Sequence, residues 1–346
     1  MSIAQYAFVN ARIGAMRSYL LEPTQIRSMV ESPSLEDALS FLKTSYGGEL
    51  AKLTSPSLRD VEDALVMSLV HDYEKLTKSV VGLSRTFLER YAKKLEIISL
   101  KTLIIMKLSK TKVEHYPFVL YRTITKETVD KLLQMETIEE MVEMLKLTEY
   151  YEVLKKAMAS HKEDNNPYPF LVALDTYIFG RLGEIMGKMK GKDKEMVRRL
   201  IGVEIDYKNF MTALRLMGTD EALAWESLIP YRYALKDEHL RNLINLRSIS
   251  ELPTQLVDTK YREIVTQGVR EFESTGSLHG LEREFQKYMF KQYRYVFYGD
   301  RFHIGLPIAY LNLKENEIRN VVAILKGKES GLPVEKIEET VLISGF

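Results

Sequence analysis

The chain has 346 residues, enough for roughly two or three domain-sized units, and 45% of them are hydrophobic. It contains no cysteine, which excludes a disulfide framework, a thiolate zinc site, an iron–sulfur cluster and a catalytic thiol. The 49 basic and 48 acidic side chains give a net charge of +1, which argues against a dedicated nucleic-acid binder because such proteins usually carry a strong basic excess.

No segment of the sequence is expected to cross a membrane. The most apolar stretch, residues 95–108, is interrupted by polar and charged side chains, whereas a membrane-spanning helix needs about 20 mostly apolar residues. The first residues lack the charged leader and the apolar run of a secretory signal. We therefore expect a soluble, cytoplasmic protein that associates with membranes only through partners.

Three amphipathic helix pairs recur along the chain with one common spacing of apolar residues. Four apolar positions that predict a short helix are followed by four at i, i+3, i+4 and i+7, which form one face of a second helix. This repetition favours three related units over three unrelated helix pairs. The positions are Leu21, Ile26, Met29, Val30, Leu35, Ala38, Leu39 and Leu42; then Ile124, Val129, Leu132, Leu133, Ile138, Met141, Val142 and Leu145; then Leu235, Leu240, Leu243, Ile244, Ile249, Leu252, Pro253 and Leu256.

A hydroxyl residue precedes the second helix of each pair, and a carboxylate follows three residues later. This pattern predicts a capping box, in which the hydroxyl and the carboxylate each accept a hydrogen bond from a free backbone amide of the first turn. Asp37 is the weakest of the three carboxylates, because Glu or Gln is the usual residue there. The three predicted boxes are Ser34 with Asp37, Thr137 with Glu140, and Ser248 with Glu251.

A second motif, acid-x-x-Asn followed by an apolar residue, lies on a predicted long helix associated with each pair. The segment 7–11 is placed before the first pair and keeps only the asparagine. The copies are Asp206 with Asn209, Glu317 with Asn320, the looser Glu96 with Ser99, and Asn10 alone.

These patterns predict an all-α fold of three related helical units. We place them at residues 1–88, 89–200 and 201–346, the last including a C-terminal copy of the leading helix. We expect roughly 70–80% helix and no significant sheet, well above the average domain. The aromatic run Tyr293–Tyr298 alternates like a strand, but its flanks favour helix, so we assign it to a helix or an irregular turn.

A search for catalytic motifs indicates no chemistry. The pairs Gly187-Lys188 and Gly191-Lys192 lack the glycine spacing of a phosphate-binding loop, and the six histidines form no metal-binding pair. We therefore expect no catalytic residues, no metal, no cofactor and no direct nucleotide binding.

Two stretches resemble the C subunit of the archaeal-type (A-type/V-type) rotary ATPases, a family that includes the d subunit of the eukaryotic V-type ATPase. The N-terminal stretch runs from Tyr6 to Arg17, and the C-terminal stretch runs from Pro307 through Asn320 to Ile337. The segment around Asp206, Asn209 and Arg215 resembles an internal copy. Together the similar segments cover essentially the whole chain.

The resemblance implies a non-catalytic central-stalk subunit. Members of this family are all-helical and funnel-shaped, with three similar units around a pseudo-threefold axis and a central cavity. They sit on the cytoplasmic face of the cell membrane, dock the rotary shaft onto the proteolipid ring, and transmit torque for ion-coupled ATP synthesis or hydrolysis. The expected partners are therefore the ring and the shaft subunits, with no nucleic acid.

Basic residues near the ends of the long helices are candidates for the partner interface. They are Arg12, Arg17, Lys101, Arg215 and Lys326. They could converge on one rim that meets the ring, or they could be solvated charges that favour helix C-termini. Two other readings of the chain stay open: a generic helical-repeat scaffold that binds a protein partner, and an enzyme with an unrecognised site.

Overall fold

The computed structural model describes residues 3–51, 57–110, 116–159 and 165–343. Helices make up 75% of the structure, and the described residues contain no strand beyond one isolated bridge between Tyr121 and Ile124. The all-α fold class and the expected helix content are therefore confirmed. The aromatic run at 293–298 is also helical, because it forms the end of α18 (His279–Tyr295) and the 3₁₀ turn η2 (Val296–Tyr298).

The chain divides into two compact units. Unit 1 combines residues 1–85 with residues 286–346, so segments from both ends of the chain fold together, and unit 2 comprises residues 86–285. The divisions fall within the helices α7 (Gly82–Tyr91) and α18. The three-unit boundaries inferred from the repeats stay a prediction.

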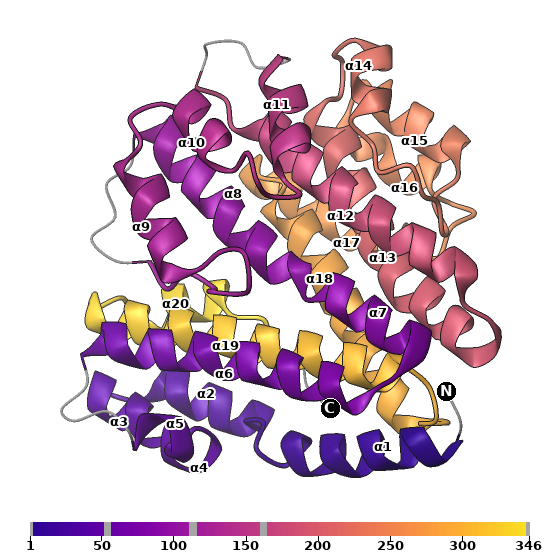
Figure 1. Cartoon of the computed structure of the whole chain (residues 1–346). Coiled ribbons are helices and arrows are strands. Elements are labelled where there is room, and N and C mark those ends of the chain that lie inside the picture. The colour runs from indigo at the N-terminus through magenta and orange to yellow at the C-terminus, as the bar shows by residue number, and fades with distance from the viewer. Residues whose placement is uncertain (1–2, 52–56, 111–115, 160–164, 344–346) are drawn as a thin grey trace. The chain divides into compact units, whose positions relative to one another are not determined.

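Unit 1 is built around α19 (Gly305–Glu329), which contacts α1, α2, α3, α6 and α20; α6 runs beside it in Figure 1. The first half of α19 is buried around its whole circumference. The other helices of the unit are α1 (Ile3–Arg17), α2 (Pro23–Glu31), α3 (Leu35–Ser40), α4 (Leu42–Ser45), α5 (Gly47–Leu50), α6 (Leu58–Ser79) and α20 (Val334–Thr340), with the start of α7, the end of α18 and η2.

Unit 2 contains two long helices that carry the acid-x-x-Asn motif or its serine variant, α8 and α13. The remaining helices include the second and third pairs. The elements are α8 (Lys93–Ser109), α9 (Lys126–Gln134), α10 (Ile138–Met144), α11 (Tyr151–Ala159), α12 (Tyr168–Lys188), α13 (Gly191–Arg215), α14 (Glu221–Glu226), α15 (Asp237–Ile244), η1 (Ile249–Glu251), α16 (Leu252–Gln255) and α17 (Arg262–Thr275), with the end of α7 and the start of α18.

The predicted helix pairs are present. They are α2 with α3, α9 with α10, and α15 with η1 and α16. Ile26, Val129 and Leu240, which share one position in the repeat, are all buried. The apolar spacing therefore identified the buried face of the first helix in each pair.

The predicted caps are confirmed as N-caps, but only one of the three is a complete capping box. Thr137 accepts from the Glu140 amide while the Glu140 carboxylate accepts from the Thr137 amide. The Ser34 hydroxyl accepts from the Asp37 amide, but the Asp37 carboxylate accepts from that hydroxyl at 2.6 Å. Asp60 at the start of α6 accepts from both the amide and the hydroxyl of Ser57, so an aspartate can complete a capping box, and the Asp37 box is incomplete because only the Ser34 hydroxyl donates to it.

The third pair departs from the prediction for a different reason. Ser248 accepts from the Ser250 amide instead of the Glu251 amide, and the first turn is 3₁₀. Pro253 has no amide hydrogen to donate back to Ile249, so the α-helical hydrogen bond is missing at this position. The second helix of this pair therefore starts with a tighter turn.

Candidate functional site

The acid-x-x-Asn motifs place three carboxylates inside the protein. Glu96 on α8 and Asp206 on α13 are fully buried, and Glu317 on α19 is 6% exposed. A buried carboxylate is costly unless hydrogen bonds replace its water shell. Each of the three therefore needs a set of donors, and each set comes from the loop before a helix pair and from a tyrosine that follows that pair.

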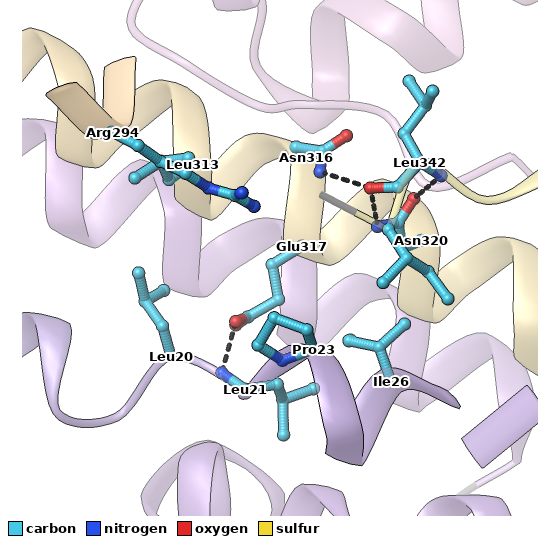
Figure 2. A pocket seen from close by; sticks show the side chains of 11 residues that line it. Leu20, Leu21, Pro23, Ile26, Arg294, Leu313, Asn316, Glu317, Asn320 and Leu342 are labelled. Atoms are coloured by element: carbon cyan, nitrogen blue, oxygen red, sulfur yellow. Dashed lines mark hydrogen bonds between the residues drawn. The ribbon is translucent and has the colours of Figure 1, made fainter. Parts of the chain in front are cut away.

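Glu317 binds the first helix pair of the chain. It accepts from the Leu21 amide at 2.5 Å (Figure 2). It also accepts from the Tyr46 hydroxyl at 2.6 Å, and Lys314 Nζ lies 3.4 Å away. Burial raises the pKa of Glu317, and Lys314 opposes that shift. The side chain also borders a cavity of about 60 Å³. The carboxylate that serves the first pair thus comes from the C-terminal helix, and not from the 7–11 segment that precedes the pair.

Glu96 binds the second pair in the same way. It accepts from the Thr123 amide at 3.0 Å and from the Tyr150 hydroxyl at 2.5 Å. Lys93 Nζ lies 3.0 Å from Glu96 and 3.1 Å from Glu149. The cation is again one helical turn before the carboxylate.

Asp206 binds the third pair with a different set of donors. The Tyr261 hydroxyl donates at 2.7 Å, and the amides of Tyr233, Ala234 and Leu235 donate at 3.2, 2.7 and 3.2 Å. Burial raises the pKa of Asp206 despite these four bonds. No described residue forms an ion pair with this carboxylate.

A glycine lets the amide-bearing loop approach α13. An added Cβ at Gly202 would lie 2.5 Å from the Tyr233 ring, closer than real side chains allow. Gly202 lies one helical turn before Asp206 on the same helix. The absent side chain therefore lets the loop lie against the helix that carries the carboxylate.

The asparagine or serine of the acid-x-x-Asn motif bonds a loop to each of the helices α13, α19 and α8. Asn209 accepts from the Ile229 amide at 2.8 Å and donates to its carbonyl at 3.1 Å. Asn320 does the same with Leu342 at 2.9 and 3.0 Å (Figure 2). Ser99 makes the equivalent pair with Val119, at 2.9 and 3.0 Å, so serine replaces asparagine without loss of either bond.

The tyrosines of the three clusters were not predicted from the sequence. A weak signal exists, because an apolar residue, a threonine and the tyrosine follow each second helix at a common spacing. Thr148 and Thr259 each bond back to the carbonyl of the preceding apolar residue and accept from the amide of the tyrosine. The three sets are Phe41, Thr44 and Tyr46; Leu145, Thr148 and Tyr150; and Leu256, Thr259 and Tyr261.

Each of the five predicted interface residues contacts another side chain of its own unit. None is fully exposed, so a partner would meet cations that are already engaged. The contacts are Arg12 Nη1 to Ser79 Oγ at 2.6 Å, Arg17 over the Phe297 ring at 4.7 Å, Lys101 to Asp175 at 2.6 Å, Arg215 to Glu282, and Lys326 to Glu62 at 3.3 Å.

Lys101 is the most perturbed of these cations. It shares the Asp175 carboxylate with Lys208, whose Nζ lies 3.2 Å from the same oxygen. Burial and the charge of Lys208 lower the pKa of Lys101 to about 8. Burial alone would raise the pKa of Asp175, but the two lysines outweigh it and hold that pKa low.

Metal and membrane sites were also sought. The described part of the chain holds no group of three or more His, Asp or Glu side chains able to bind a metal ion. It also has no helix whose length and apolar character would let it span a bilayer.

Comparisons with known proteins agree over nearly the full length. The family described as ATP synthase (C/AC39) subunit matches residues 9–340. The C subunit of the A-type ATP synthase from Methanocaldococcus jannaschii is 29% identical, over 99% of this chain and 87% of the relative. Its counterpart from Pyrococcus abyssi is 28% identical over 97% and 90%, and the one from Haloferax volcanii is 25% identical over 97% of both chains. The resemblance inferred from the motifs is confirmed.

Proposed function

The chain belongs to the ATP synthase (C/AC39) subunit family, and from this premise we propose that it is a non-catalytic central-stalk subunit of an A-type ATP synthase. The match from residue 9 to residue 340, shared with relatives named as C subunits of A-type ATP synthases, is the observation that carries the proposal. In this role the protein docks the rotary shaft onto the proteolipid ring and transmits torque for ATP synthesis or hydrolysis.

The repeated carboxylate clusters support the proposed three-unit architecture. Each cluster joins one long helix to one helix pair through a tyrosine hydroxyl and a backbone amide. We propose three such units around a pseudo-threefold axis, in a funnel with a central cavity. Glu317 lies in the predicted third unit but binds Leu21 and Tyr46 of the first, so the unit around the first pair draws on α19.

The clusters also suit a protein that transmits torque. Torque is lost if a helix pair slides against the helix that supports it. A buried carboxylate bonded to several donors resists sliding, because each displaced donor would be left unsatisfied away from water at about 1–3 kcal/mol. Close packing of the remaining apolar side chains adds resistance to compression.

The proposed partners are the proteolipid ring and the shaft subunits. The chain would lie on the cytoplasmic face of the membrane and reach it only through them, without binding nucleotide or nucleic acid. Arg12, Arg17, Lys101, Arg215 and Lys326 are the proposed interface cations. An interface of this kind would set the rate and register of docking and would weaken with salt.

Capture of the partners tests this function. The purified full chain should bind detergent-solubilised proteolipid ring and the shaft subunits, and it should hydrolyse no ATP. ATPase activity that follows the chain through every purification step would contradict the proposal. A chain that fails to bind the ring, or fails to bind the shaft subunits, would also contradict it.

A charge-matched pair of variants tests the interface residues. Replacing Arg12, Arg17 and Arg215 together by Gln should weaken ring binding, most strongly at low salt. The control replaces Lys78, Lys192 and Lys336 by Gln, three exposed lysines whose acidic partners lie within one helical turn. Equal ring binding by the two triple variants across a salt series would show that the three arginines are ordinary surface charges.

A further inference from the structure

Unit 1 contains a second, much larger cavity, of about 600 Å³. It is partly enclosed, and its volume lies in the range of small-molecule sites. Four parts of the unit line it: α1, α6, α19, and the segment of α4 and α5. Tyr46 and Lys314, which contact Glu317, are also among the lining residues.

Each of the three long helices presents one stripe to the cavity, and each stripe carries one cation. On α6 the stripe is Ser68, Asp72 and Lys75, at i, i+4 and i+7. On α19 it is Tyr310 and Lys314, one turn apart. Lys314 is buried, Arg12 is half-buried and Lys75 is exposed, and a buried lysine in the lining of a cavity that two further cations also line requires an explanation. The third cation is Arg12 on α1.

The cations exceed the anions that face them. Asp72 is the one carboxylate among the described lining residues, and it accepts from the Tyr310 hydroxyl at 2.6 Å. Arg12 and Lys75 form no ion pair with any residue that the structure describes; Arg12 donates one bond to Ser79 Oγ. The three cations of the lining therefore exceed Asp72 and Glu317, the ion-pair partner of Lys314, by one positive charge.

The most buried of the three cations, Lys314, is positioned by contacts within the protein. Lys314 is 4% exposed, and its Nζ lies 3.7 Å from the centre of the Tyr46 ring and 3.4 Å from Glu317. Glu317 is also bonded to Tyr46 and Leu21. The ammonium group thus shares its acidic neighbour with two other donors and keeps hydrogen-bonding capacity for an anion.

The rest of the lining is uncharged and combines hydroxyl groups with the apolar side chains of Ala15 and Met16. Thr44 and Ser45 supply hydroxyl groups on the wall formed by α4. Hydroxyl-rich walls suit a ligand that carries hydroxyl groups of its own. A phosphate group carries about −1.5 to −2 at pH 7 and three strong acceptor oxygens, so it can accept from several cations at once, whereas a single carboxylate has one charge and two oxygens.

We propose that this cavity binds a small organic phosphate, with the phosphate between Arg12, Lys75 and Lys314 and the remainder along Thr44 and Ser45. Arginine supplies the planar fork that fits phosphate oxygens, and the lysines act as point charges. The phosphate ester can belong to a free metabolite or to a phospholipid headgroup. The site shares Arg12 with the proposed interface, but the binding of phosphate does not depend on the docking function proposed above.

Calorimetric titration of the full chain at low salt tests the site, with inorganic pyrophosphate and glycerol 3-phosphate as probes and succinate as the control anion. We expect saturable one-to-one binding of at least one phosphate probe that weakens with salt, and affinity at least about tenfold lower for succinate, a difference of about 1.4 kcal/mol. Sedimentation with phosphatidylglycerol vesicles, against phosphatidylcholine vesicles, identifies a lipid headgroup as the source if the vesicles bind and glycerol 3-phosphate does not.

Variants locate the binding. R12Q/K75Q should lower the affinity about tenfold or more, whereas K78Q, on the same helix but outside the cavity, should stay within about twofold. K75E changes one exposed residue that none of the docking predictions uses, and it should lower the affinity further than K75Q. The proposal is overturned if neither phosphate probe nor phosphatidylglycerol binds, if succinate binds equally well, or if folded K75E and R12Q/K75Q bind like the parent.

Discussion

The clusters around Glu96 and Asp206 both hold a loop against a long helix, but a cation lies beside Glu96 and none lies beside Asp206 among the described ion pairs. Both carboxylates are fully buried, both accept from a tyrosine hydroxyl, and both hold the loop before a helix pair. Glu96 is balanced by Lys93, three residues earlier on α8. The equivalent position before Asp206 is Val203, and two further loop amides take the place of the cation.

The Glu317 cluster follows the Glu96 pattern, with Lys314 three residues before the carboxylate. A buried carboxylate can therefore be balanced by a cation on its own helix or by a loop that turns three amides toward it. The first solution is built from the sequence of one helix. The second depends on Gly202, which lets the loop approach, and so depends on tertiary structure.

The largest effect should follow from removing the carboxylate that has no cation. D206A would leave three amides and the Tyr261 hydroxyl without their acceptor inside unit 2. We expect a loss of about 3–5 kcal/mol in the free energy of unfolding, since each unsatisfied buried group costs about 1–3 kcal/mol and some will find water. Urea denaturation measures it, with K194A, at an exposed position of the same helix, as control. A loss below about 1 kcal/mol would mean that the cluster contributes little to stability.

The difference in electrostatics can be tested by one pair of substitutions at equivalent positions. K93M should cost about 2–4 kcal/mol, because it leaves the Glu96 carboxylate buried without its cation. V203I changes the matching position beside Asp206 by a single methylene, where no cation is lost, and should cost about 1 kcal/mol. Equal losses in urea denaturation would mean that Lys93 acts through packing and not through its charge.

Much of this architecture could be predicted from the sequence, but the clusters could not. The helix pairs and the Thr137 cap depend on residues within two turns of each other, so the local spacing determines them. The bond from Leu21 to Glu317 spans 296 residues, and sequence order favoured the nearer segment 7–11. The amides that replace a cation at Asp206 have no sequence signature, because every residue except proline carries one.

A smaller effect is expected in the pH dependence of stability, through the buried carboxyl of Asp206. Burial raises the pKa of Asp206 above 3.8, its ordinary value, so between the two values the folded state binds more protons than the unfolded state. The contribution of Asp206 to stability is therefore fully present below about pH 4 and is lost as the pH rises through the raised pKa.

D206N removes this titration while keeping the shape of the side chain. The stability of the parent relative to D206N should fall as the pH rises from about 4, which urea denaturation at successive pH values measures. Subtracting the free energy of unfolding of D206N from that of the parent cancels the contributions of groups that titrate alike in both proteins. A difference that grows with pH, or that stays constant between about pH 3 and 8, would contradict the raised pKa.

The smallest predicted effect compares the caps of the pairs that these clusters hold. T137A removes the hydroxyl of a complete capping box and should cost about 1 kcal/mol, whereas S248A removes a hydroxyl whose acceptor role serves a 3₁₀ turn without a reciprocal bond and should cost about half as much. Both caps lie at the protein surface, so the substitutions leave the packing of the core unchanged. Thermal unfolding measures both shifts, with T266A on α17 as a control, because the Thr266 hydroxyl donates to the Arg262 carbonyl and caps no helix. If S248A proved as costly as T137A, the reciprocal bond from Glu140 would add nothing, and the two caps would be equivalent despite their different geometry.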